Sequence, residues 1–531
     1  MSDLRAKLLQ IPAAEPGNIV GYEIEQEDRP YVLQDQWQFQ SSLPTREARF
    51  TLILPAGWEY KAIWINYPES SPASPSPNQW QWVVNNVKPV LSEDNMPPRT
   101  GVEGQMLLSL FPPGDSQKKG FQNWSEMGRW QDELLRGREE SSPEINQKIA
   151  ELTSGATTPL AKMQALSVFV QHNIRYVAIE LGIGGLQPHP AREVFAHRYG
   201  DCKDKATLLA AMLKVIGVDS YQLTINSRRG GVTAQSPPQL GWFNHQILAI
   251  RLPDGVPDTA LAAVVNHPKF GRLLIFDPTD DLTPFGQLSG NLQANYGLLV
   301  TQGGGGLLQL PQLPSDTNGV RRTGTLVLSA TGTLSGKIKE EHLGDSAASH
   351  RSFLQSATQD KRVKPIETTL AHSLASFRIT SASLGNLSVP DQPFIYNYSF
   401  TADRYAQPAG SLLIVRPRVL GNESSDIMER KEPRKYPVEF DGPEKDVDVY
   451  EITLPAGYEV DELPLPSDAD YSFASYHSKT EVHGNVLRYQ RTYEIKELSV
   501  PPSKLNELKT LYRIIAGDER NTAVLKPTQS H

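Results

Sequence analysis

Cys202 is the only cysteine among the 531 residues of the chain, and its sequence setting is typical of a reactive thiol. Gly200 and Asp201 precede it, and aspartate often caps the start of a helix. An apolar repeat follows, in which Cys202, Ala206 and Leu209 share one face of a predicted helix. The first turn of a helix offers unpaired N–H groups and the positive end of the helix dipole, which favour a thiolate. We therefore expect Cys202 to be a nucleophile.

A structural role for Cys202 is the alternative, because a lone cysteine is often a small buried apolar residue. Its position directly after a helix cap, at the mouth of an apolar helix, favours the reactive thiol. A single cysteine also forms no disulfide within the chain, so it leaves the redox compartment undetermined.

A thiolate that cleaves an amide needs a base to protonate the leaving group, and that base needs an orienting group. His245 is the best candidate for the base, since it lies in a predicted strand beside aromatic residues. Partial removal from water is expected to keep its pKa near working pH. Asp277 ends the next strand, and Pro278 keeps it extended. Neighbouring strands lie about 4.8 Å apart, so the two side chains can hydrogen-bond.

Each of these residues also has an ordinary explanation. His245 is equally compatible with a half-buried, hydrogen-bonded histidine, and Asp277 with a cap of the Pro278-Thr279 turn. Only the combination with Cys202, in this order and on these elements, favours a catalytic triad.

Other chemistries fit the sequence less well. Zinc sites usually contain closely spaced ligand pairs, and His189 and His197 flank a short predicted helix without such partners. The Gly-x-Ser-x-Gly elbow of serine hydrolases does not occur. The interval from Cys202 to His245 is far shorter than the roughly 130–150 residues of the papain pattern. We therefore expect neither a metal nor a cofactor.

The elements that must position these residues form an α+β unit. Residues 124–152 have a charged helical pattern, and Thr158 and Pro159 supply the cap and first position of a second helix. A short helix that ends near Phe195 leads to the helix of Cys202. Alternating strands are expected afterwards at residues 221–225, 242–252 and 273–277. Four glycines at residues 303–306 lack the Lys-Ser/Thr of a phosphate loop, so we expect a linker or wide turn there.

β-rich regions flank this unit. Strands are expected in the N-terminal region from residue 18, beginning with an apolar segment at 18–24, and a surface loop is expected at 70–77. The C-terminal region should contain a hairpin around residues 331–332, a polar helical stretch at 347–374, and a closing helix at 503–515. A Leu-Pro-Ala-Gly motif at residues 54–57 recurs at 454–457, which we interpret as one strand–turn–strand solution used twice.

The predicted fold class is therefore multidomain: a β-rich N-terminal domain at residues 1–115, a helical lead-in and α+β core at 116–315, and a β-rich C-terminal domain at 316–531. The net charge of −8 argues against nucleic acid as a partner. No apolar run approaches membrane-spanning length. The oligomeric state cannot be deduced from these features.

Three motifs in the core resemble the transglutaminase-like superfamily: residues 199–205 (YGDCKDK), 243–245 (FNH) and 276–279 (FDPT). Residues 174–180 and 190–195 resemble the lead-in of a bacterial subgroup in which this core lies between two β-rich domains of uncharacterised function. Residues 16–22 resemble the middle of the N-terminal domain of that subgroup, and residues 435–438 and 454–458 resemble its C-terminal domain.

The resemblance implies a papain/transglutaminase-like core with a triad of Cys202, His245 and Asp277. It implies acyl transfer on an amide or peptide substrate through a thioester, followed by transfer to water or to an amine. Relatives with this core include proteases, amidases, glycanases and cross-linking enzymes, so the substrate and the acceptor stay open. The alternative is a non-catalytic interaction protein in which the core is a relic.

Localisation stays open as well. The start of the chain lacks the apolar stretch of a secretory signal, which as given predicts a cytoplasmic protein. The resemblance to the middle of an N-terminal domain predicts a start that lies upstream, and proteins of this subgroup are often exported.

Overall fold

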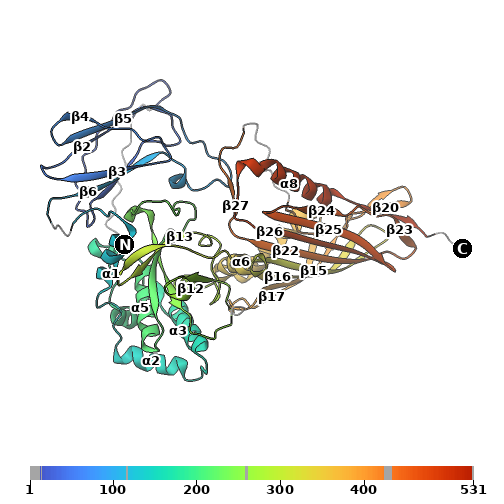
Figure 1. Ribbon diagram of the computed structural model, residues 1–531. Coiled ribbons are helices and arrows are strands. Elements are labelled where there is room, and N and C mark those ends of the chain that lie inside the picture. Colours follow the sequence, from blue (N-terminus) through green and yellow to red (C-terminus); the bar gives the residue numbers. More distant parts are fainter. Residues whose placement is uncertain (1–11, 13–14, 115–117, 258–260, 424–432, 529–531) are drawn as a thin grey trace.

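The computed structural model describes residue 12 and residues 15–114, 118–257, 261–423 and 433–528. As predicted, the protein has several domains: a β-rich N-terminal region, a mixed middle region, and a β-rich C-terminal domain. Figure 1 shows the C-terminal domain extending away from the other two, with the N-terminal region above the middle region.

The N-terminal region contains two antiparallel three-stranded sheets. One sheet has the order β1 (Gln34–Gln38), β6 (Gln105–Phe111) and β3 (Glu59–Ile65), and the other has β2 (Thr45–Ile53), β5 (Gln79–Val87) and β4 (Ala73–Ser76). Alternate residues of both sheets meet in an aromatic core that includes Trp37, Phe50 and Trp82.

Two predictions for this region are wrong. Residues 18–24 form no strand, and Ile19 and Tyr22 are 99% and 75% exposed. No described strand lies beside this segment, and an extended segment without a partner forms no ladder hydrogen bonds. The predicted loop at 70–77 contains the short strand β4, which pairs with β5 at the edge of its sheet.

The middle region is a six-stranded antiparallel sheet. Its order is β11 (Val264–His267), β12 (Gly271–Phe276), β10 (His245–Arg251), β9 (Ser220–Ile225), β13 (Tyr296–Thr301) and β14 (Gly304–Gln309). Helices cover both faces. α1 (Trp124–Leu135) packs on β13 and β14, where Met127 contacts Leu298 and Val300. The opposite face is covered by α2 (Pro143–Thr153), α3 (Pro159–Asn173), α4 (Ala191–His197) and α5 (Cys202–Val215).

The predicted helix starts of the middle region are confirmed. Thr158 caps α3, with its hydroxyl accepting a hydrogen bond from the Ala161 N–H at 3.1 Å, and Pro159 is the first helical residue. α5 begins at Cys202 and is followed by Gly217 with φ of 76°, a left-handed conformation that ends the helix.

The four glycines at 303–306 are neither linker nor wide turn. Only Gln302 and Gly303 form the turn, and Gly304–Gln309 is β14, paired with β13. The reason is close packing: a Cβ on Gly305 would lie 2.9 Å from the Gly128 Cα of α1. Glycines here let a helix backbone approach a strand backbone.

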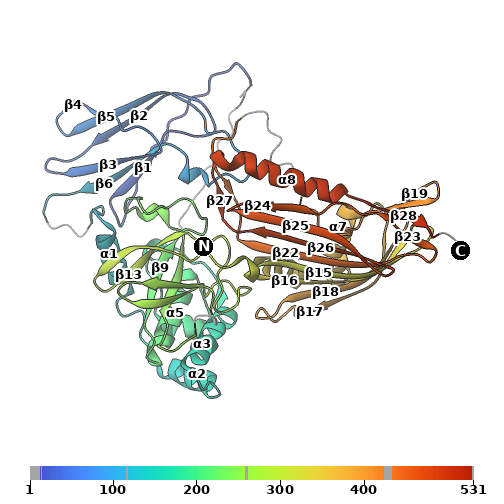
Figure 2. The same ribbon diagram turned by 45° about the vertical axis from the view of Figure 1, so that its right-hand side comes forward.

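The C-terminal domain is dominated by an eight-stranded sheet, which Figure 2 shows with α8 along one face. Its order is β17 (Arg378–Gly385), β18 (Phe394–Ala402), β16 (Leu334–Leu343), β15 (Gly319–Leu328), β22 (Glu444–Thr453), β26 (Val486–Ile495), β25 (Ala474–His483) and β24 (Ser467–Asp470). α8 (Leu505–Arg520) buries Leu508, Leu511 and Ile515, which recur at helical spacing, against Tyr476 and Tyr493.

The predicted hairpin around residues 331–332 is the β15–β16 pair, and the polar helical stretch is two helices. These are α6 (Gly344–Ser356) and α7 (Lys364–Ser373). A small second sheet has the order β19 (Gln407–Ala409), β20 (Leu412–Val415), β28 (Ala523–Pro527) and β23 (Tyr458–Glu462).

The repeated Leu-Pro-Ala-Gly motif makes the same turn in both flanking regions. Gly57 and Gly457 have φ of 79° and 80°, and the N–H groups of Trp58 and Tyr458 donate to the carbonyls of Pro55 and Pro455. Each turn joins strands of two different sheets, β2 to β3 and β22 to β23.

Contacts also tie the three regions together. Glu93 of the N-terminal region accepts hydrogen bonds from the backbone N–H groups of Lys435 and Tyr436. Arg229, in a loop of the middle region, lies 3.6 Å from the carboxylate of Glu439.

Candidate active site

Cys202 is the first residue of α5, and a reciprocal cap fixes the start of this helix. The Asp201 carboxylate accepts a hydrogen bond from the Asp204 N–H, and the Asp204 carboxylate accepts one from the Asp201 N–H, both at 3.2 Å. The Cys202 side chain is 9% exposed. The thiol is therefore held at the positive end of the helix, as the sequence predicted.

The strand register brings the other two predicted residues together. Leu248 of β10 pairs with Phe276, the last residue of β12, so Asp277 follows diagonally across from His245. His245 Nε2 lies 2.7 Å from Asp277 Oδ2. α5 packs across β9 and β10 and brings Cys202 to the same point, where the His245 ring also hydrogen-bonds its side chain. Since Nε2 faces Asp277, Nδ1 is the nitrogen that remains for the thiol.

The electrostatics of His245 differ from the sequence expectation. Burial lowers its pKa, but the hydrogen bonds to Asp277 and Cys202 and the negative charges of those groups raise it from 6.5 to about 10. The expected pKa near working pH was wrong because the sequence does not show how closely two acidic groups flank the ring. The arrangement favours an imidazolium beside the sulfur.

Asp277 combines both roles considered for it. Its Oδ2 binds His245, while its Oδ1 accepts hydrogen bonds from the Thr279 N–H at 2.8 Å and the Thr279 hydroxyl at 2.7 Å. Burial alone raises the pKa of Asp277, but the bonds from His245 and Thr279 lower it below its ordinary value. The turn therefore holds an ionised carboxylate in place for the histidine.

Tyr176 is a site residue that the sequence reasoning missed. It lies in β7 (Arg175–Tyr176), which pairs in parallel with β8 (Tyr199–Gly200), two residues before the cysteine. Its hydroxyl hydrogen-bonds Cys202. Burial and the negative charges of Cys202, Asp201 and Glu180 raise the pKa of Tyr176 far above 10, so the phenol stays a neutral donor. Tyr176 precedes a glycine-rich segment at residues 182–185 in the sequence, but no spacing rule links it to the thiol.

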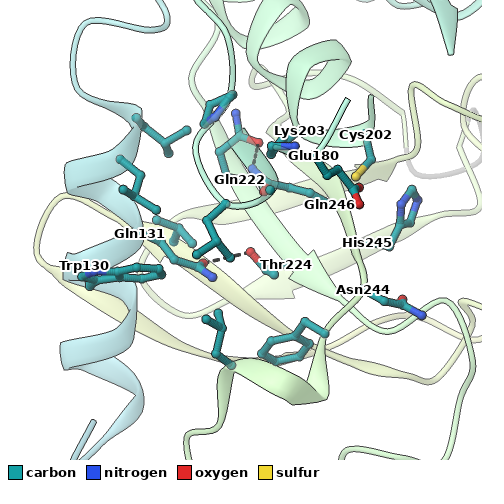
Figure 3. Close-up of a pocket in the computed structure, with 18 residues that line it drawn as sticks. Trp130, Gln131, Glu180, Cys202, Lys203, Gln222, Thr224, Asn244, His245 and Gln246 are labelled. Atoms are coloured by element: carbon teal, nitrogen blue, oxygen red, sulfur yellow. Dashed lines mark hydrogen bonds between the residues drawn. The ribbon is translucent and has the colours of Figure 1, made fainter. Parts of the chain in front are cut away.

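A cavity of about 300 Å³ opens beside the thiol. Figure 3 shows Cys202, Glu180 and His245 at one end of this cleft, and Trp130 and Gln131 of α1 at the other. The loop at 227–240 reaches the cleft with Leu240. The cleft is large enough for a few residues of an extended chain.

Two lysines beside Cys202 support the site. Lys203 forms a buried ion pair with Asp201. Lys205 donates from its ammonium to the carbonyls of Gln171 at 3.1 Å and Ile174 at 2.8 Å. Burial lowers the pKa of Lys205 to about 8, partly offset by the charges of Asp281 and Asp277. These contacts join the start of α5 to the end of α3, just before β7.

The two remaining histidines considered for a metal lie apart from the triad. His189 hydrogen-bonds the Asp204 carboxylate through its backbone N–H and its Nδ1. The His197 ring stacks on Tyr199, with centroids 5.7 Å apart. In the described part of the chain, no three His, Cys, Asp or Glu side chains gather as metal ligands would.

Sequence comparison finds matches to three families along the chain. The Transglutaminase-like superfamily matches residues 146–232, which contain Cys202 and end before His245. Domains of unknown function match residues 1–91 (DUF3857) and 411–525 (DUF3858). The middle of the chain thus matches the transglutaminase-like superfamily and is flanked by matches to these two domains, as the resemblance predicted. No curated protein gives a significant match.

The same fold occurs in a crystal structure from Parabacteroides distasonis ATCC 8503, described as a "putative protease". It superposes with a TM-score of 0.56 at 11% identity, over 94% of this chain and 76% of that chain. At this identity the likeness concerns the fold alone. A "putative cysteine protease" from Cytophaga hutchinsonii is 11% identical over 46% of this chain and 74% of that one. Its TM-score of 0.20 is too low to support a conclusion about the fold.

No helix in the described ranges has the length and apolar character that crossing a bilayer requires.

Proposed function

We propose that this protein is a cysteine-dependent acyl-transfer enzyme that acts on amide or peptide bonds through a thioester. One observation carries the proposal: a helix-start cysteine hydrogen-bonds a histidine whose other nitrogen is held at 2.7 Å by a partly buried carboxylate. These are the nucleophile, base and orienting group that amide cleavage requires.

The proposed first half-reaction uses the three side chains in sequence. The Cys202 sulfur attacks the amide carbonyl carbon, an S–C bond forms, and the carbonyl π electrons move to oxygen. When that oxyanion collapses, the C–N bond breaks and His245 gives its Nδ1 proton to the departing amine. Asp277 keeps Nε2 hydrogen-bonded throughout, which fixes the ring and stabilises its positive charge.

The second half-reaction releases the acyl group. Neutral His245 takes a proton from the incoming water or amine as it attacks the thioester, and the C–S bond breaks to restore the thiolate. Water gives a carboxylic acid, whereas an amine gives a new amide. The geometry of the triad is compatible with either acceptor.

Two groups can stabilise the oxyanion. The Cys202 backbone N–H belongs to the first turn of α5, where helical N–H groups have no partner within the helix. The Tyr176 hydroxyl already reaches the sulfur, so it lies close to where the carbonyl oxygen of an attacked substrate would be. We assign both as donors.

Direct detection of the thioester tests the proposal. The purified protein is incubated with a peptide library, with and without small primary amines, and intact-mass spectrometry follows the protein and its products. We expect a covalent acyl adduct that is lost after Cys202→Ala. Turnover that persists in that variant would contradict the mechanism, and a library that yields neither adduct nor product would favour the non-catalytic relic.

A further inference from the structure

Besides the Cys202 sulfur, three charged side chains line the cleft, and two of them are neutralised by neighbours. Lys203 is ion-paired with Asp201, and His245 is paired with Asp277. Glu180 is the third, and it forms an ion pair with no other residue in the part of the chain that the structure describes. The cleft therefore carries one carboxylate that takes part in no salt bridge among the described residues.

Glu180 is also close to the reacting sulfur. Its charge acts on the same Tyr176 hydroxyl that hydrogen-bonds Cys202. Figure 3 places Glu180 at the Cys202 end of the cleft, and its side chain is exposed. A solvated carboxylate at this position costs little to maintain, and a cation that displaces water from it gains an ion pair in a partly enclosed site.

The remainder of the cleft suits a peptide-like chain. Its floor is a row of amides in which Gln246 donates to Gln222 at 2.8 Å, and Gln222 donates to Glu139 at 2.9 Å. Apolar side chains, Trp130 and Phe243 among them, also line it. Amide side chains can hydrogen-bond a backbone, but they do not select a charge.

From these observations we propose that Glu180 selects amide substrates that carry a positively charged group, such as a lysine side chain or a free amine, next to the reacting carbonyl. The inference rests on the proposed function for the identity of the reacting bond. It adds the charge of the substrate, which the triad does not specify.

The single cysteine allows a test that needs no turnover. Methanethiosulfonate reagents with a trimethylammonium, a hydroxyl or a sulfonate tail transfer their alkylthio group to the Cys202 sulfur, forming a mixed disulfide as the S–SO2 bond breaks and methanesulfinate leaves. The ratio of the cationic to the anionic rate reports the local charge, and differences in thiolate content cancel in it. We expect Glu180→Gln to lower this ratio by about tenfold at low ionic strength.

Glu193→Gln is the matched control, because Glu193 is an exposed carboxylate on α4 that does not line the cleft. This variant should leave the ratio unchanged. A second readout is protection of Cys202 from iodoacetamide by N-acetyl-lysine amide compared with N-acetyl-norleucine amide. The lysine compound should protect better, and Glu180→Gln should abolish the difference.

A ratio that changes by less than about twofold in Glu180→Gln, with equal protection by both amides, would overturn the proposed selectivity. Neither readout depends on catalysis. A loss of selectivity is therefore distinguishable from a failure of the proposed function, which would appear as no acyl adduct on Cys202.

Discussion

Two histidine–carboxylate pairs, one partly buried and one buried, lie in different regions of this protein. In the middle region, His245 Nε2 is 2.7 Å from Asp277, and in the C-terminal sheet, His342 Nε2 is 3.1 Å from Glu340. The difference is in the second ring nitrogen. That of His245 faces a thiol at the end of a cleft, whereas His342 Nδ1 is 2.8 Å from the Ser346 hydroxyl.

The surroundings explain why only one pair is a candidate for catalysis. His342 is 3% exposed, and its ring packs against the ring of His350, with the centroids 4.2 Å apart. Glu340 also accepts a hydrogen bond from Tyr398 at 2.6 Å. A substrate cannot reach this pair, so its polar contacts serve the packing of the sheet. A histidine–carboxylate pair therefore becomes a reactive site only where a nucleophile lies beside it and a cleft admits the substrate.

The largest effect is expected for the nucleophile. Cys202→Ala should reduce amide cleavage by at least about 10⁴-fold, because no other group can form the thioester. The melting temperature should change by only a few degrees, since one sulfur atom at a helix start is removed. Steady-state assays together with thermal denaturation check both parts.

Removal of the carboxylate should lower activity in the first pair and only stability in the second. Asp277→Asn is expected to lower kcat by about 10³-fold, because the ring loses its charged partner and its fixed orientation. The matched change Glu340→Gln should leave kcat unaltered and lower the free energy of unfolding by about 2 kcal/mol. A comparable loss of activity in both variants would remove the distinction between them.

The contributions of the two pairs to the free energy of unfolding should depend on pH in opposite directions. The pKa of His245 is raised to about 10, so its pair stabilises the fold fully below about pH 6.5 and progressively less as the pH rises through about 10. For Glu340, burial opposes ionisation, but the contacts with His342 and Arg322 lower its pKa to about 2. That contribution is complete above about pH 4.5 and disappears as the pH falls through about 2.

Denaturant unfolding of matched variants measures these two trends. The destabilisation caused by His245→Gln should shrink as the pH is raised from about 7 towards 10. The destabilisation caused by Glu340→Gln should shrink as the pH is lowered from about 5 towards 3. Parallel pH profiles for the two variants would mean that the pairs do not differ as described.

The smallest effect is expected at the donor that only the structure revealed. Tyr176→Phe removes one hydroxyl from the site and should lower kcat by about tenfold, with little change in KM, because the bond to the oxyanion forms after binding. Iodoacetamide labelling of Cys202 should stay within a few-fold of the unmodified protein. An unchanged kcat would exclude Tyr176 as an oxyanion donor.

The helices and the proximity of the three candidate residues could be predicted because their signals are local. Asp201 and Thr158 are helix caps, and the alternation through β10 and β12 puts His245 at the start of β10 and Asp277 directly after the neighbouring strand β12. These are properties of a few adjacent residues, and they survive folding unchanged.

The errors concern contacts between distant segments. The glycines of β14 look like a linker until Gly128 of α1 is seen to pack on Gly305. Tyr176 reaches the thiol only because β7 pairs with β8, which no sequence period reveals. The raised pKa of His245 depends in the same way on two partners that are brought together by folding.

The rate of Cys202 alkylation by iodoacetamide at neutral pH, compared between the unmodified protein and His245→Gln, tests the central claim most directly. The single cysteine makes every modified molecule informative. A thiolate held beside an imidazolium predicts labelling that is at least about tenfold faster than that of a free-thiol peptide and is lost in His245→Gln. Labelling that is no faster than that of the peptide, and equal in the two proteins, would contradict the account.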